Sequence, residues 1–195
     1  CMVVSDQRAL RAMVWRLLGG DTIITIRDEE KANDWASWGL QHAAGATHSE
    51  WVYVAETLVL AGFRDSAAQA IDQALSNGES AYAWAVKGYI LEDLNAGKAE
   101  IELAFRKAIE FTPPLPKPML ALAWWSLGRA QAADHDRFQE AETSLRKAIE
   151  INPKSAAAWN QLGRLLEGVN RNKEAEFAFR KAVELEPMKP YHWYM

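Results

Sequence analysis

Apolar and small residues recur along this chain at the spacing of helices. In several stretches a tryptophan is followed by apolar or small residues three, four and seven positions later. In most cases a further stretch with helical spacing comes next and ends at a proline. Residues at these spacings share one face of an α-helix, whereas a half-buried strand alternates every second residue. Proline ends the second helix, because it has no amide donor and clashes with the preceding turn. The pattern predicts an all-α fold of antiparallel helix pairs.

Three segments of the chain nearly copy one another, and each ends in proline. They are residues 105–113, 145–153 and 179–187. Each follows a tryptophan with a glycine four residues later, in the pairs Trp84 and Gly88, Trp124 and Gly128, and Trp159 and Gly163. A weaker copy begins at Trp51 and lacks both the glycine and the proline. We therefore predict four repeats, over residues 48–80, 81–115, 121–155 and 156–189.

The last copy resembles the tetratricopeptide repeat (TPR), whose pattern is Trp-x2-Leu-Gly-x2-Tyr, then Ala-x3-Phe, Ala and Pro over about 34 residues. It departs from that pattern at one position, with Leu166 in place of tyrosine. Its matching residues are Trp159, Leu162, Gly163, Ala175, Phe179, Ala182 and Pro187. The resemblance covers residues 48–189 and implies a right-handed superhelical solenoid of antiparallel helix pairs. It is specific for the fold and says almost nothing about the ligand.

The two ends of the chain fit the repeat less well. Residues 1–47 predict an N-terminal helical segment that is either a degenerate repeat or a cap. Near the other end, Trp193 follows Pro187 at the same spacing that separates proline and tryptophan one repeat earlier. Residues 190–195 are therefore predicted to begin a truncated fifth repeat. On this basis we expect the sequence to be a fragment at both ends.

A proline-rich segment, residues 113–118, joins the second and third repeats. Closely spaced prolines favour an extended and stiff backbone. We interpret the segment as a loop that restarts the next helix. The alternative is a ligand for a proline-recognising module, because Pro113 and Pro116 have the PxxP spacing.

The composition is that of a folded chain without a basic surface. Of its 195 residues, 49% are hydrophobic and 25% are charged, which lies outside the range of disordered proteins. The formal net charge of −4 gives no basic footprint, so nucleic acid is not an expected partner. No apolar run approaches the roughly 18 residues that span a bilayer, so we expect no transmembrane segment in this chain. The single cysteine, Cys1, excludes an internal disulfide.

Residue types that carry catalysis or bind metals show no usable arrangement. The histidines are dispersed, and we expect each to be solvated or to lie in a loop rather than to bind a metal. Residues 134–136, Asp-His-Asp, are expected to form a polar turn between helices. Phosphate-binding loops and serine nucleophile motifs are absent from the sequence. We therefore predict no catalytic residue, no cofactor and no metal site, and expect that this chain is not an enzyme.

The resemblance also indicates a binding face, because the first helix of each pair lines the concave surface of such an array. Its outward positions are expected two residues before each tryptophan and one, two and five residues after it. Arg129 and Arg164 are equivalent and are expected to meet acidic groups; alternatively they are solvated or pair with Glu167. The candidate peptide-binding residues are Tyr53, Tyr82, Tyr89, Trp125, Arg129, Asn160, Gln161 and Arg164.

Three hypotheses about function follow from this pattern. The first is a protein-protein interaction scaffold or adaptor that binds a peptide or helix in the concave groove. The second is a recruitment or regulatory segment of a larger enzyme or membrane-associated assembly factor, whose catalytic part lies outside this chain. The third is self-association through the exposed C-terminal repeat end. The sequence leaves the partner and the compartment open.

Overall fold

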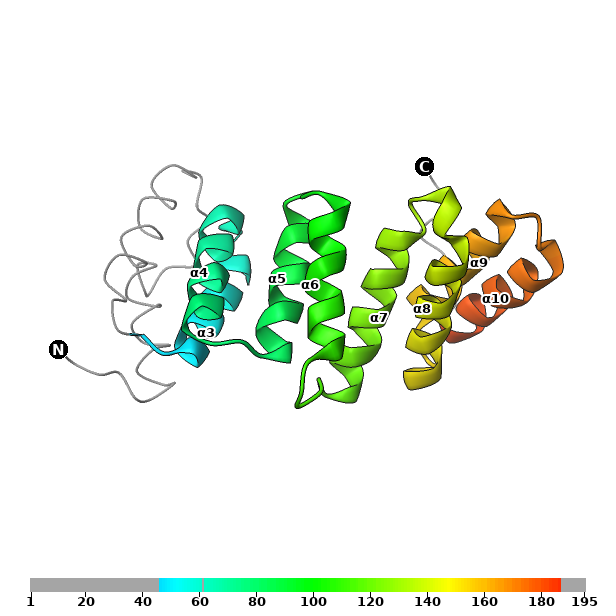
Figure 1. Ribbon diagram of the computed structural model, residues 1–195. Helices are drawn as coiled ribbons and strands as arrows, with labels where there is room; N and C mark the ends of the chain where they lie inside the picture. The colour runs from blue at the N-terminus through cyan, green and yellow to red at the C-terminus, as the bar shows by residue number, and fades with distance from the viewer. Residues whose placement is uncertain (1–45, 61, 187–195) are drawn as a thin grey trace, which may run out of the picture. The chain divides into compact units, whose positions relative to one another are not determined.

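A computed structural model describes residues 46–60 and 62–186. Within them the backbone forms α-helices, one short 3-10 helix and no strand (Figure 1). The helices are α3 (His48–Leu60), α4 (Arg64–Asn77), α5 (Ala81–Asp93), α6 (Lys98–Glu110), α7 (Lys117–Gln131), η1 (His135–Arg137), α8 (Phe138–Ile151), α9 (Ala156–Gly168) and α10 (Asn172–Leu185). The all-α prediction is confirmed. The predictions for residues 1–45 and for the truncated fifth repeat lie outside the described residues.

The chain divides into two compact units, Cys1–Glu100 and Ile101–Met195, so the division falls within the first turn of α6. In the first unit, α3 packs along α4, and α4 packs along α5. In the second unit, α7 packs along α8, α9 packs along α10, and α8 also contacts α9 (Figure 1). The helix pairs predicted for the first, third and fourth repeats are therefore present, as α3 with α4, α7 with α8, and α9 with α10, while the limits of the four repeats stay a prediction.

Alanine lets the helices of the first unit approach closely. The residues Ala67, Ala70 and Ala74 lie on one face of α4 and are fully buried. Larger side chains from the neighbouring helices pack against this face, because small and large residues interdigitate at native density. The cluster includes Trp51, Ala55, Leu58, Phe63, Ile71, Val86 and Ile90.

Glycine has the same part in the second unit, at the position where the repeat pattern requires it. A Cβ atom on Gly163 of α9 would lie 2.7 Å from Cδ1 of Phe179 on α10. A Cβ atom on Gly128 of α7 would lie 2.8 Å from Cγ of Leu145 on α8. Both distances are too short for a real contact, so the paired helices touch only because these residues have no side chain.

The tryptophans that open the repeats are buried to different extents. Trp51 is 5% exposed and belongs to the core of the first unit. The equivalent residues Trp84, Trp124 and Trp159 are half-buried, and Trp159 packs against the core cluster of the second unit. The indole N–H of Trp159 donates to the carbonyl of Pro153 at 3.0 Å. This tryptophan thus ties its helix to the turn that precedes it.

The proline-rich segment leads directly into α7. Pro116 is the N-cap residue of this helix, and Pro118 lies in its first turn, where a missing amide hydrogen costs nothing. Leu115, which lies between Pro114 and Pro116, is 5% exposed. The segment is therefore a loop that restarts a helix, in line with the first of the two interpretations.

His48 is not a solvated histidine, and the expectation for it is wrong. Its ring is half-buried, with Nδ1 2.9 Å from the carbonyl oxygen of Ala74 and Nε2 3.0 Å from Oγ of Ser80. A carbonyl oxygen only accepts, so Nδ1 is the donor. Ser80 also caps α5, because its hydroxyl accepts from the amide of Ala83 at 3.0 Å. His48 therefore joins the start of α3 to the end of α4 and the start of α5.

Residues 134–136 form a turn, as the sequence predicts. The carboxylate of Asp134 accepts from the backbone amide of Asp136 at 3.2 Å and caps η1. Among the described residues, no group of three or more His, Cys, Asp and Glu side chains is placed to hold a metal ion. None of the helices that the structure describes is long and apolar enough to cross a membrane.

Four charged residues join α6 to the start of α8 in a network that we call the first network. Arg137 is bidentate to Glu102, with distances of 2.5 and 2.9 Å, and also contacts Glu140 at 2.7 Å. Arg106 contacts the same Glu140 at 3.1 Å. The side chain of Glu102 is only 11% exposed, and its carboxylate is paired with the guanidinium group of Arg137.

The second network repeats this arrangement one helix pair later. Arg171 contacts Glu142 at 2.7 Å and Glu174 at 2.6 Å. Arg146 contacts Glu142 at 2.7 Å and Glu174 at 3.4 Å. Each network therefore places two carboxylates and two guanidinium groups in a closed ring that joins one second helix to the next.

These networks are expected to make the second unit sensitive to acid. The hydrogen bond from Arg171 lowers the pKa of Glu174. For Glu142, burial opposes the charged form, but Arg171 and Arg146 outweigh burial and lower its pKa. A glutamate whose pKa is lower in the folded protein than in the unfolded chain stabilises the fold at pH values above its unfolded-state pKa of about 4.3. This stabilisation is lost as the pH falls through the folded-state pKa. The thermal midpoint should therefore fall below about pH 4.5.

Circular dichroism melts between pH 3 and pH 7 check this prediction. Replacing both carboxylates of the second network, with Glu142→Gln and Glu174→Gln, should lower the midpoint at neutral pH and flatten its acid dependence. A midpoint that falls with acid equally steeply in the wild type and in this variant would show that other groups control the acid sensitivity.

Candidate peptide-binding face

The first helices of the first unit, α3 and α5, bring two candidate tyrosines next to a carboxylate. Tyr53 and Glu56 lie one turn apart on α3, and the hydroxyl of Tyr82 on α5 donates to Oε1 of Glu56. Partial burial, the hydrogen bond and the charge of Glu56 raise the pKa of Tyr82 to about 12. Tyr82 lies two residues before Trp84, and Glu56 lies five residues after Trp51. The hydrogen bond between them therefore joins two of the outward positions that the sequence predicts.

Tyr89 lies two turns beyond Tyr82 on α5 and so shares its side of the helix. Burial raises the pKa of its hydroxyl, and the charge of Glu92 raises it further. Tyr53 and Tyr89 are both half-buried, while Tyr82 is 37% exposed. The first-unit part of the candidate face is therefore aromatic and acidic.

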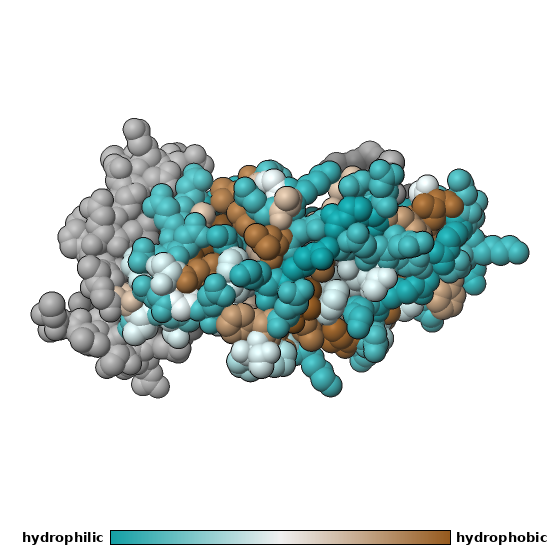
Figure 2. Space-filling view, in the orientation of Figure 1, coloured by the Kyte–Doolittle hydropathy of each residue, from teal (hydrophilic) through white to brown (hydrophobic). Residues whose placement is uncertain are grey.

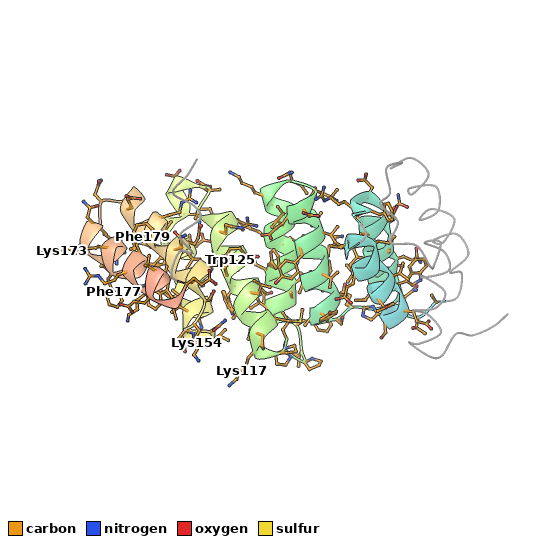
Figure 3. All side chains as sticks on the ribbon, turned by 180° about the vertical axis from the view of Figure 1, so that it is seen from behind. Lys117, Trp125, Lys154, Lys173, Phe177 and Phe179 are labelled. Carbon is orange, nitrogen blue, oxygen red and sulfur yellow. The ribbon has the colours of Figure 1, made fainter. Side chains whose placement is uncertain are left out.

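In the second unit, Trp125 and Arg129 lie one turn apart on α7. The guanidinium carbon of Arg129 is 5.1 Å from the ring centroid of Trp125, within cation–π range. Trp125 is half-buried and packs on the cluster that includes Leu145 and Leu162 (Figure 3). Its indole N–H is buried and has no hydrogen-bond acceptor among the described residues. The indole ring therefore packs against the guanidinium group of Arg129, whose side chain is exposed.

The candidates on α9 follow one turn of that helix. Asn160 and Arg164 are both exposed and are four residues apart, and Gln161 beside them is half-buried. In the described part of the chain, Arg164 forms no ion pair with Glu167, and its side chain is exposed. Arg129 and Arg164 therefore present two exposed guanidinium groups from the first helices of the second unit.

Fewer residues reach the surface of the candidate face than their spacing from the tryptophans predicts. Residues one or two positions after a tryptophan are expected on the surface, but several of them are in the core: Val52, Ala85, Val86 and Ser126. Outside such positions, polar and charged side chains predominate and apolar ones form small separate patches on the face seen in Figure 2.

Solved structures share this fold. MamA is 22% identical, with a TM-score of 0.65 over 80% of this chain and 86% of that chain. YrrB, described as a TPR protein with an unusual peptide-binding site, is 18% identical, with a TM-score of 0.67 over 92% and 82%. MamA 41-end from Desulfovibrio magneticus RS-1 is 19% identical, with a TM-score of 0.68 over 92% and 94%. At these identities the likeness establishes the fold alone.

The sequence itself identifies the family. Residues 55–116 match one model of the tetratricopeptide repeat, and residues 132–195 match another. The two matches together span well over half of the chain. No curated protein sequence matches the chain. The chain therefore belongs to the tetratricopeptide-repeat family, whose members typically act as protein-interaction modules.

Proposed function

We propose that this chain is an interaction scaffold and that the first helices of its second unit bind an extended peptide with acidic side chains. The observation that carries the proposal is the pair of exposed guanidinium groups, Arg129 and Arg164, at equivalent positions of successive repeats. A guanidinium group binds a carboxylate with two parallel hydrogen bonds, which fixes geometry as well as charge.

The neighbouring side chains fit a peptide rather than a small anion. The exposed amide of Asn160 offers both a donor and an acceptor for a peptide backbone. The ring of Trp125 gives Arg129 a fixed apolar support, which reduces the entropy lost when the arginine binds. Together these groups provide two charged anchors with backbone recognition between them.

The first unit favours a different kind of ligand group. Glu56 and Glu92 lie beside Tyr82 and Tyr89, so this part of the face repels acidic side chains. Tyrosine rings next to carboxylates suit apolar or cationic groups. The existence of a peptide-binding site in YrrB, which has a similar fold, supports the use of such a fold for peptides in general.

Selection from a displayed library of random peptides, with the full chain as bait, tests the proposal. Enriched peptides should carry at least two acidic residues, one for each guanidinium group. Enrichment of basic or purely apolar peptides, or no enrichment at all, would overturn the proposed ligand class.

A further inference from the structure

One carboxylate between the neighbouring helices α3 and α5 has no cationic partner among the described residues. Glu56 on α3 accepts a hydrogen bond at Oε1 from the hydroxyl of Tyr82 on α5. Burial, this hydrogen bond and the charge of Glu56 raise the pKa of Tyr82 to about 12, so the hydroxyl stays protonated and neutral at physiological pH. A neutral donor does not cancel the charge of a carboxylate. The pair therefore keeps one full negative charge at neutral pH.

The basic residues of the same three helices are already bound to other carboxylates. Arg64 and Lys87 are the basic residues within the stretch 48–93, and acidic residues outnumber them. Nε of Arg64 lies 2.5 Å from a carboxylate oxygen of Asp93, and Nζ of Lys87 lies 2.6 Å from one of Asp72. The excess negative charge of this unit is therefore left for groups from outside these helices.

Tyrosine rings lie beside the charge of Glu56. Tyr82 is 37% exposed, and Tyr53 lies three residues before Glu56, on the same side of α3. The face of a tyrosine ring is negative and attracts a cation, most often the guanidinium group of an arginine. The chain uses such a contact itself, because the guanidinium carbon of Arg129 is 5.1 Å from the ring centroid of Trp125.

Further along α5 the same combination of ring and carboxylate occurs again. Tyr89 lies two turns after Tyr82, and Glu92 follows it by three residues. Burial raises the pKa of the Tyr89 hydroxyl, and the charge of Glu92 raises it further, so the two groups are close. Negative charge beside tyrosine rings therefore continues along this side of α5, which adds to the attraction of a cation at Glu56.

We propose that the Tyr82–Glu56 site, formed by these two residues and Tyr53, binds an arginine side chain of a partner peptide. A carboxylate has about four lone-pair positions, and the Tyr82 hydroxyl uses one of them, so Glu56 can accept further hydrogen bonds from a guanidinium group. Arginine suits the site better than lysine, because its planar group stacks on a ring while it donates to the carboxylate and is more weakly hydrated.

The Tyr82–Glu56 site and the exposed arginines of the second unit select peptides of opposite charge. The site belongs to α3 and α5, and its argument uses no residue of α7 or α9. It can therefore be tested apart from the proposed binding of acidic peptides. Binding of an arginine peptide should be unchanged by Arg129→Glu with Arg164→Glu, because those substitutions leave α3 and α5 intact.

An NMR titration of the full chain, labelled with ¹³C on its tyrosine rings, tests this inference. The probe is a Gly-Ser peptide with blocked ends and one central arginine, so that general attraction to an acidic protein is small. The Tyr82 ring signal, which Tyr82→Phe assigns, should shift and saturate. A citrulline peptide has the same shape without the charge and should bind at least about fivefold more weakly, while a lysine peptide should be intermediate.

Two variants with the same change in charge separate the site from the net charge of the unit. Glu56→Gln should weaken binding of the arginine peptide about fivefold, because an exposed hydrogen bond to a charged group is lost. Asp65→Asn removes one charge from an exposed side chain of α4 and is the matched control. It should leave the affinity within about twofold of the wild type. Circular dichroism melts check that both variants are folded.

Three results would overturn the inference. The first is a Tyr82 signal that does not move at the highest concentration of the arginine peptide. The second is a citrulline peptide that binds as tightly as the arginine peptide, which would make the contact independent of charge. The third is equal weakening by Glu56→Gln and Asp65→Asn, which would show that only net charge attracts the peptide.

Discussion

Reversing the charges of Arg129 and Arg164 together is expected to weaken binding of an acidic peptide by about 100-fold. A hydrogen bond to a charged group contributes roughly 1.5–3 kcal/mol, and 1.4 kcal/mol corresponds to a factor of ten. Both side chains are exposed, so solvent screening keeps the loss near the lower end for two such contacts. Isothermal titration calorimetry with a selected peptide measures the effect.

A control variant with the same change in net charge isolates the position of the charges. Lys154→Glu and Lys173→Glu reverse two exposed lysines, one in the turn before α9 and one on α10 (Figure 3). Binding by this control should stay within about twofold of the wild type, because long-range effects of exposed charges are screened beyond about 8 Å at physiological salt. Equal losses in the two variants would mean that only net charge attracts the peptide.

Gly163→Val is expected to destabilise the second unit by about 2–3 kcal/mol. The Cβ atom alone would lie 2.7 Å from two atoms of the Phe179 ring, and the branched side chain adds further overlap. Overpacking of this kind typically costs about 1–3 kcal/mol, because side chains leave their rotamers or helices separate. The change in the urea unfolding midpoint at constant slope measures this loss.

Gly168→Val is the matched control on the same helix. A Cβ atom at Gly168 meets nothing within 4 Å, so the substitution should change stability by no more than about 0.5 kcal/mol. Two variants with equal stability would contradict the view that the glycine of the repeat pattern is needed for close approach of α9 and α10.

The helix pairs could be predicted from sequence because their causes are local. Gly163 and Phe179 follow a fixed pattern, and the contact between them explains why glycine is required at that point. His48 could not be assigned in the same way. Its partners, Ala74 and Ser80, are 26 and 32 residues away, and no pattern near His48 indicates them.

The candidate site was predictable to a similar degree. The stacking of Arg129 on Trp125 follows from their spacing of one helical turn. The burial of Val52 and Ala85 does not, because it depends on how closely neighbouring helices approach. The sequence analysis did not predict the charged networks, although an Arg and a Glu three residues apart recur after each Trp-x2-Leu-Gly. Spacing alone does not show that these charges meet a second pair on the preceding helix.

The most direct test of the proposed binding face is an NMR titration of the full chain with an enriched acidic peptide. Perturbed signals should concentrate on α7 and α9, including the indole N–H of Trp125, which Trp125→Phe assigns. This indole lies under the guanidinium group of Arg129, so it should respond when a carboxylate binds there. Perturbations confined to α8 and α10, with the Trp125 signal unchanged, would contradict the account.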